Sequence, residues 1–175
     1  GIALINKAID HLEHTGDQKA MIQATARKGA LEWWNNQFDE AILAANRIQE
    51  LCKSIEDDSP EKISHQFFAR HLIGMSLYAK GQAQTVIEYA QATYDRYFHK
   101  IKAFDRIRML QMMTYAYLIS ANFTKCEAYI NQGLKIAHDL NNAFVHEDLL
   151  MILAKIEIFQ GRLDEAYCHA MELMM

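Results

Sequence analysis

The sequence predicts an all-α fold of about nine helices, arranged as stacked antiparallel pairs. Apolar residues recur at helical spacing through the 175 residues, of which 51% are hydrophobic. Seven glycines and one proline are few for this length, which favours long helices joined by short turns. One pattern, a helix end followed at once by a new helix, occurs four times, in segments 29–48, 74–93, 114–133 and 154–173.

The first predicted helix covers residues 1–14 and carries a stripe of isoleucines at helical spacing. Gly16 is suited to a left-handed cap that ends this helix, and Asp17 to the N-cap of the next one. Ser59 can cap a later helix whose first turn holds Pro60, because the missing N–H of proline costs nothing there. The first three helices are expected at 1–14, 18–34 and 38–55.

Glycine and asparagine mark most of the later junctions. Gly81 and Gly161 are natural helix terminators, and asparagine follows two further helices, at positions 122 and 141. The junction within residues 99–104 has no clear signal. The later helices are expected at 61–80, 83–98, 105–121, 123–140, 144–160 and 163–175.

The repeat period follows from the small residue that opens each second helix. These residues are Ala41, Val86, Cys126 and Ala166, and the differences between their numbers are 45, 40 and 40. Helix pairs with such a period cannot bury their apolar faces alone, so they are expected to stack into a superhelical solenoid. We expect one repeat domain over 1–175, with the second helix of an incomplete repeat at 1–16 and helix pairs at 17–58, 59–99, 100–141 and 142–175.

This pattern resembles the tetratricopeptide repeat over essentially the whole chain. Gly29 and Gly74 stand where that family has its first-helix glycine, Tyr117 matches its tyrosine, and Ala41 and Ala166 match its signature alanine. The resemblance implies a right-handed solenoid whose first helices line a concave groove. The chain departs from the family pattern at seven positions. Thr114 and Ala154 replace the glycine, Glu32, Leu77 and Glu157 replace the tyrosine, and Val86 and Cys126 replace the alanine.

The period is longer than the family's usual ~34 residues. Such long repeats resemble those of bacterial sensory and regulatory proteins. Examples are LuxR-like transcription factors of the maltose-activator type, peptide-sensing regulators, and proteins that join repeats to GGDEF or kinase output domains. The resemblance implies a site that binds a protein or peptide, with a small-molecule effector as an alternative, in the concave groove. The residues expected to bind there are Trp34, His71, Met75, Tyr78, Arg108, Gln111, Tyr115, Met151 and Lys155.

The mixture of aromatic, methionine and scattered polar side chains in this set suits a peptide helix or an extended segment. Arg108 and Lys155 are the two cations that could hold a carboxylate or a peptide C-terminus. Trp33 and Trp34 point about 100° apart on a helix, so they cannot share one face. We expect Trp34 to be the exposed groove anchor and Trp33 to pack in the core.

No catalytic, metal or cofactor site is expected from the sequence. His11 and His14 have a spacing that can place two ligands on one face, but a third ligand is lacking. Cys126 and Cys168 sit at or beside tight packing positions, where a thiol behaves as a small apolar group. Phosphate-binding loops, nucleophile elbows and dinucleotide fingerprints do not occur. Acidic pairs such as Asp39-Glu40 recur as first-turn acids, which the helix dipole favours.

The formal charge of −4, without a basic block, argues against direct nucleic-acid binding by this chain. Apolar runs fall short of the roughly 20 residues that a membrane span needs. Three unpaired-looking cysteines favour a reduced, cytoplasmic compartment. The apolar last residues, 170–175, suggest a fragment of a longer protein whose exposed repeat ends self-associate.

Three functions from different classes remain open at this stage. The first, which the sequence favours, is a non-catalytic ligand- or partner-sensing repeat domain of a bacterial signalling or transcriptional regulator. The second is a constitutive protein–protein interaction scaffold. The third is a helical regulatory arm of an enzyme such as a GGDEF cyclase or a kinase.

Overall fold

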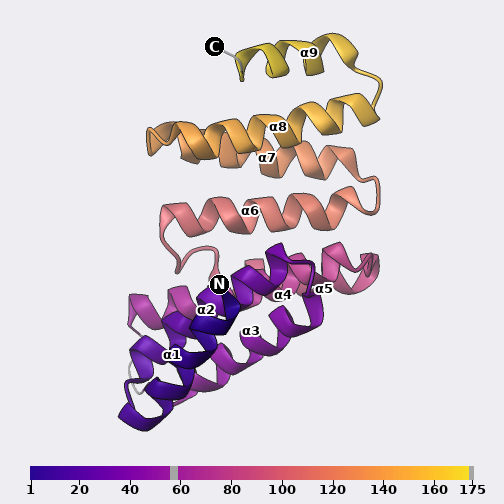
Figure 1. Ribbon diagram of the computed structural model, residues 1–175. Coiled ribbons are helices and arrows are strands. Elements are labelled where there is room, and N and C mark those ends of the chain that lie inside the picture. The colour runs from indigo at the N-terminus through magenta and orange to yellow at the C-terminus, as the bar shows by residue number, and fades with distance from the viewer. Residues whose placement is uncertain (56–58, 174–175) are drawn as a thin grey trace.

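The computed structural model describes residues 1–55 and 59–173, and over these ranges the chain forms nine α-helices and no strand (Figure 1). The all-α prediction is therefore confirmed. The helices are α1 (Ile2–Thr15), α2 (Gln18–Trp34), α3 (Phe38–Lys53), α4 (Pro60–Ala79), α5 (Ala83–Tyr97), α6 (Ala103–Leu118), α7 (Phe123–Asp139), α8 (Ala143–Phe159) and α9 (Leu163–Glu172).

The helices are stacked in the order of the sequence. Each one packs against the next, and α4 also packs against both α2 and α6. Figure 1 shows successive layers that run from α1, α2 and α3 at one end to α9 at the other. The helices α2, α4 and α6 therefore lie side by side, which creates the surface considered below.

The helix caps expected at Gly16, Asp17 and Ser59 form in the structure. Gly16 has a φ of 69°, and the Asp17 carboxylate accepts a hydrogen bond from the backbone N–H of Ala20. The Ser59 hydroxyl accepts a hydrogen bond from the backbone N–H of Lys62, with Pro60 in the first turn. These capped ends satisfy donors that a helix cannot satisfy by itself.

The short turns after α2, α4, α6, α7 and α8 each contain one residue in the left-handed conformation. Two of these residues are Gly81 and Gly161, which adopt it without strain. Two others are Asn36 and Asn141, which tolerate it better than most side chains. Ala121 also adopts it, with a φ of 53°. A single residue in the left-handed conformation is therefore a shared feature of these five turns.

Some of the predicted details are wrong. Helix α3 ends at Lys53 rather than at residue 55, and α6 ends at Leu118 rather than at residue 121. Helix α6 begins at Ala103, earlier than the predicted residue 105, with Lys102 as its N-cap. Cys168 is exposed, whereas Cys52 and Cys126 are buried. Helix α9 packs against α8, and its remaining surface is open to solvent, so the expected tight packing around Cys168 does not form.

Buried apolar side chains form two clusters that meet at α4. One cluster joins α2, α3 and α4, and its members include Ile22, Ile48 and Leu72. The other extends from Phe67 of α4 through α8 and includes Ile130. Within the described residues, none of the helices combines the length and apolar composition needed to span a bilayer.

Gly29 marks a close approach between helices. A Cβ atom there would lie 2.7 Å from Leu72 Cδ2 and 3.0 Å from Ala44 Cβ, whereas at Gly133 its nearest neighbour would be Leu149 Cδ1 at 3.2 Å. Replacing a glycine inside a helix by alanine stabilises the helix, because glycine loses more conformational freedom on folding. Both substitutions share this stabilisation, so it cancels when the two variants are compared. We expect Gly29→Ala to be about 1–3 kcal/mol less stable than Gly133→Ala in urea unfolding. Equal stabilities would contradict the close packing described here.

Candidate functional site

Three adjoining hollows cross the surface formed by α2, α4 and α6, and together we call them the groove. The first has a volume of about 220 Å³, the second about 420 Å³ and the third about 500 Å³. The first and second share Trp33, Trp34 and Met75, and the second and third share Tyr78 and Ala79. The three hollows therefore form one continuous path.

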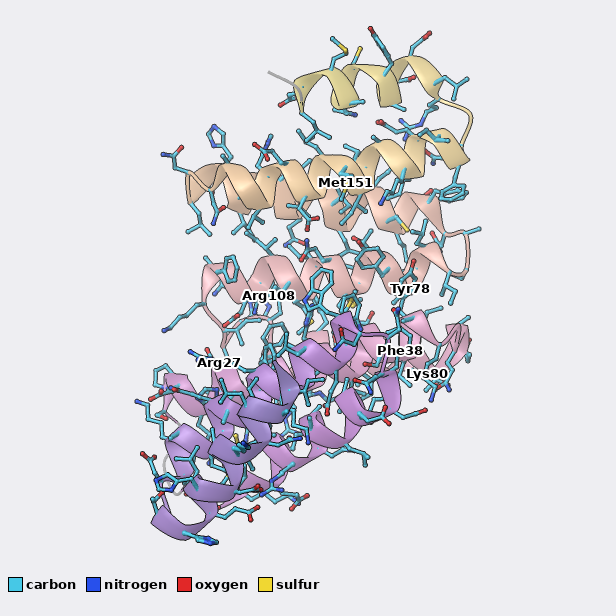
Figure 2. All side chains as sticks on the ribbon, viewed as in Figure 1. Arg27, Phe38, Tyr78, Lys80, Arg108 and Met151 are labelled. Atoms are coloured by element: carbon cyan, nitrogen blue, oxygen red, sulfur yellow. The ribbon has the colours of Figure 1, made fainter. Side chains whose placement is uncertain are left out.

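Seven of the nine side chains expected to bind a ligand line the groove. They are Trp34, His71, Met75, Tyr78, Arg108, Gln111 and Tyr115. The remaining two, Met151 and Lys155, are exposed on α8 and do not line any of these hollows. Figure 2 shows Arg108 on α6 and Met151 on the separate layer formed by α8. Helix α8 packs against α7 and α9, and Met151 and Lys155 lie on it away from the three hollows.

The tryptophan pair lies at the junction of the first two hollows. Trp34 is 75% exposed, whereas Trp33 is partly buried against the cluster of α2, α3 and α4. Their rings meet edge to face with centroids 5.2 Å apart. The expectation that Trp34 is the exposed member is confirmed, and its large apolar ring is available to a ligand.

Arg108 places a positive charge in the first hollow. Its guanidinium lies 4.7 Å from the centroid of the Phe104 ring, and it forms no ion pair with a carboxylate of the described residues. Burial, with the Arg108 charge as the second cause, lowers the pKa of His71 to about 3. His71 is therefore neutral at pH 7, and Arg108 is the cation that this hollow offers to a carboxylate.

Two tyrosines form the wall of the second hollow. The ring centroids of Tyr78 and Tyr115 are 4.9 Å apart. Burial raises the pKa of Tyr115 to about 12, and the charge of Asp148 contributes to the rise. Both phenols stay neutral at physiological pH and can donate hydrogen bonds. The side-chain amide of Gln111 donates a hydrogen bond to Asp148, which links α6 to α8.

The structure also shows groove residues that the sequence did not predict. Phe38 lines the second hollow and Phe123 the third, and both open second helices. Their aromatic type at the same position, directly after the turn, was a signal that could have found them. Phe159, which ends α8, completes the third hollow and is 67% exposed.

The histidines and the buried cysteine that the sequence raised as candidates for metal binding or catalysis lie outside the groove. His11 and His14 are both exposed, and no group of three or more His, Cys, Asp or Glu side chains there is placed to hold a metal ion. Burial raises the pKa of the Cys126 thiol to about 11, which makes it a poor nucleophile. The groove is thus lined mainly by aromatic rings and Met75, with the Arg108 cation at one end.

Two buried glutamates were noted in the sequence only as departures from the repeat pattern. Glu32 lies 3.6 Å from Lys28, and Glu157 lies 2.8 Å from His169. Both face the second helix of their own pair rather than the groove.

Comparison with protein-family models and with curated proteins gives no match for this chain.

Proposed function

We propose that the chain is a tetratricopeptide-like solenoid whose groove binds a peptide segment of a partner protein. The observation that carries this proposal is the continuity of the three hollows across α2, α4 and α6. A path of this kind fits an extended or helical peptide, which needs several adjoining subsites. The stacked order of the helices and the regular turns support the solenoid.

The chemistry of the groove defines the kind of peptide. Exposed Trp34 and the Tyr78–Tyr115 pair favour apolar or aromatic side chains. Met75 lies between them and adapts to irregular shapes. Arg108 favours a carboxylate, either the peptide C-terminus or an acidic side chain. The groove therefore binds an apolar peptide with one anionic anchor.

Binding of this kind fits a sensing or regulatory module of a bacterial signalling or transcriptional regulator. Such a module carries no catalytic group of its own, and its partner or peptide signal provides the input. A small-molecule effector with a carboxylate and an apolar body would use the same groove residues.

Peptide binding can be measured by the change in tryptophan fluorescence, since both tryptophans line the groove. Short synthetic peptides with apolar residues and a free C-terminal carboxylate are the probe, with C-terminally amidated copies as their controls. We expect Arg108→Ala to weaken binding of the carboxylate peptides about 10- to 100-fold, because a charged hydrogen-bonding partner is lost. The matched substitution Lys155→Ala removes an exposed cation outside the groove and should change the affinity less than about twofold.

The two variants and the two peptide forms give a clear decision. If Arg108→Ala and Lys155→Ala weaken binding equally, the groove is not the site. If amidated and free peptides bind equally well, the C-terminus is not the group that Arg108 holds. Absence of a fluorescence change with all peptides would overturn the proposed function.

A further inference from the structure

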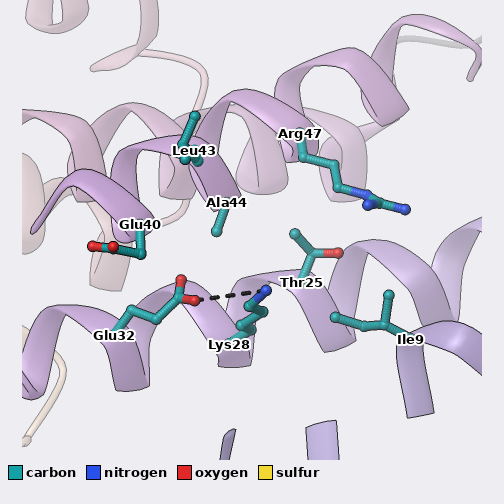
Figure 3. Close-up of a pocket in the computed structure, with 8 residues that line it drawn as sticks. All are labelled: Ile9, Thr25, Lys28, Glu32, Glu40, Leu43, Ala44 and Arg47. Carbon is teal, nitrogen blue, oxygen red and sulfur yellow. Dashed lines mark ion pairs between the residues drawn. The ribbon is translucent and has the colours of Figure 1, made fainter. Parts of the chain in front are cut away.

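A second cleft lies away from the groove, between α1, α2 and α3. Its volume is about 210 Å³, and Figure 3 shows the side chains that form it. Glu32 of α2 and Glu40 of α3 lie at one end, with aliphatic walls beside them. The lining residues are Ile9, Thr25, Lys28, Glu32, Glu40, Leu43, Ala44 and Arg47.

Glu32 is the unusual group in this cleft. It is only 5% exposed, and its Oε2 atom is buried without a hydrogen-bond partner among the described residues. Figure 3 shows its carboxylate directed into the cleft, toward Glu40 and Ala44. Burial raises the pKa of Glu32 against the lowering effect of Lys28, and the Glu40 charge adds to the rise. An unpaired buried carboxylate oxygen is costly, so a cation at this place would stabilise it.

Neither Lys28 nor Arg47, the two cations of the cleft, forms a hydrogen bond with the Oε2 atom of Glu32. Lys28 approaches Glu32 only at 3.6 Å, through the Oε1 atom, and its side chain is 32% exposed. Arg47 is paired with Glu13 at 2.5 Å. Glu40 forms no ion pair with a described residue. Two carboxylates thus line the cleft together with Lys28 and Arg47, and the Oε2 atom of Glu32 has no hydrogen-bond partner among the described residues.

Comparison of the repeats shows what normally fills this space. Three residues after the small residue that opens the second helix, the later repeats have an aromatic ring, in Tyr89, Tyr129 and His169. The first repeat has Ala44 there. Two of these rings contact the residue that corresponds to Glu32. Tyr129 stacks on Tyr117 with centroids 5.8 Å apart.

The last repeat gives the closest parallel, because it also has a glutamate at this position. Glu157 is 3% exposed, and its Oε2 atom lies 2.8 Å from Nδ1 of His169. In the first repeat the same glutamate faces Ala44, and the cleft is open. His169 therefore approaches the Oε2 atom of Glu157, whereas the Oε2 atom of Glu32 has no hydrogen-bond partner among the described residues and only its Oε1 atom pairs, with Lys28.

We propose that the cleft between α1, α2 and α3 binds a small protonated nitrogen base, whose N–H group takes the place at Glu32 that His169 takes at Glu157. The aliphatic side chains of Ile9 and Leu43 would contact the carbon part of the ligand. Glu40 would provide a second carboxylate for its charge. The cleft is smaller than a typical drug-sized site, which fits a ligand with a single ring or a short chain. This site is independent of the groove and of its proposed function.

Isothermal titration with imidazole at pH 6, where an imidazole is mostly protonated, tests the proposal on the intact chain. n-Butylamine in a parallel titration distinguishes a ring from a chain. We expect one saturable site for at least one of the two, with a dissociation constant on the order of 1 mM for so small a ligand. Arg108→Ala should leave this binding unchanged. No saturable heat with either compound at tens of millimolar would overturn the proposal.

Four variants, each checked by circular dichroism for its helical fold, identify the site. Glu32→Gln should weaken binding at least tenfold, because the carboxylate is lost. Ala44→His should abolish binding, because the new imidazole ring fills the cleft and pairs with Glu32 in place of the ligand. Ala44→Phe fills the space without a donor for Glu32, so it should also block binding but melt at a lower temperature than Ala44→His. His169→Ala should open a second site beside Glu157 and raise the stoichiometry to two. Binding that is unchanged in both Glu32→Gln and Ala44→His would place the ligand elsewhere and refute the assignment.

Discussion

Replacing Phe67 by alanine is expected to lower the free energy of unfolding by about 3–5 kcal/mol. Phe67 is 1% exposed and belongs to the larger apolar cluster, next to the point where the two clusters meet on α4. Its removal would leave a cavity between helices that cannot collapse freely, because contacts with α2, α3, α5 and α6 hold α4 in place. Urea unfolding followed by circular dichroism gives the free energy directly.

Trp34→Ala is the matched control, since it also removes a large aromatic side chain. Trp34 is exposed, so its loss should change the free energy of unfolding by less than about 0.5 kcal/mol. The same substitution should weaken peptide binding in the groove. A loss of stability for Trp34→Ala that equals the loss for Phe67→Ala would contradict the burial assigned to these two rings.

Acidification is expected to destabilise the chain through His71. The folded-state pKa is about 3, below the ordinary value of 6.5 that applies in the unfolded chain. Between these values the unfolded state binds more protons, so stability rises with pH and is lost as the pH falls through the window. For this single group the loss at pH 5 is about 2 kcal/mol relative to pH 7.

His71→Gln removes the titrating group while retaining a neutral polar side chain. The difference in free energy of unfolding between pH 7 and pH 5 should be about 2 kcal/mol smaller in this variant than in the parent chain. His138→Gln, which makes the same replacement at a histidine with an 86% exposed side chain, serves as the control for the substitution itself. His65, whose pKa burial also lowers, contributes in the same direction and remains in both variants. An identical pH dependence in His71→Gln and the parent would show that His71 is not held neutral.

The sequence determined the helices and their caps. Gly16, Asp17, Ser59 and Pro60 act within a few residues of themselves, so their roles can be read without knowing the fold. The resemblance to the tetratricopeptide repeat implied which side chains of α2, α4 and α6 face the same direction, because aligned positions on similarly placed helices share one face. Seven of the predicted binding residues lie together for this reason.

Only the tertiary structure shows where equivalent positions of the repeat have different surroundings. Met151 and Lys155 occupy the same repeat position as their counterparts on the earlier helices, yet they lie outside the groove because α8 packs differently from α4 and α6. Glu32 and Glu157 look alike in the sequence, as two departures from one pattern. Their surroundings differ because the residue facing each comes from another helix, Ala44 in one case and His169 in the other. Burial and pairing depend on contacts between helices, and a repeat pattern specifies those contacts only where neighbouring repeats are packed in the same way.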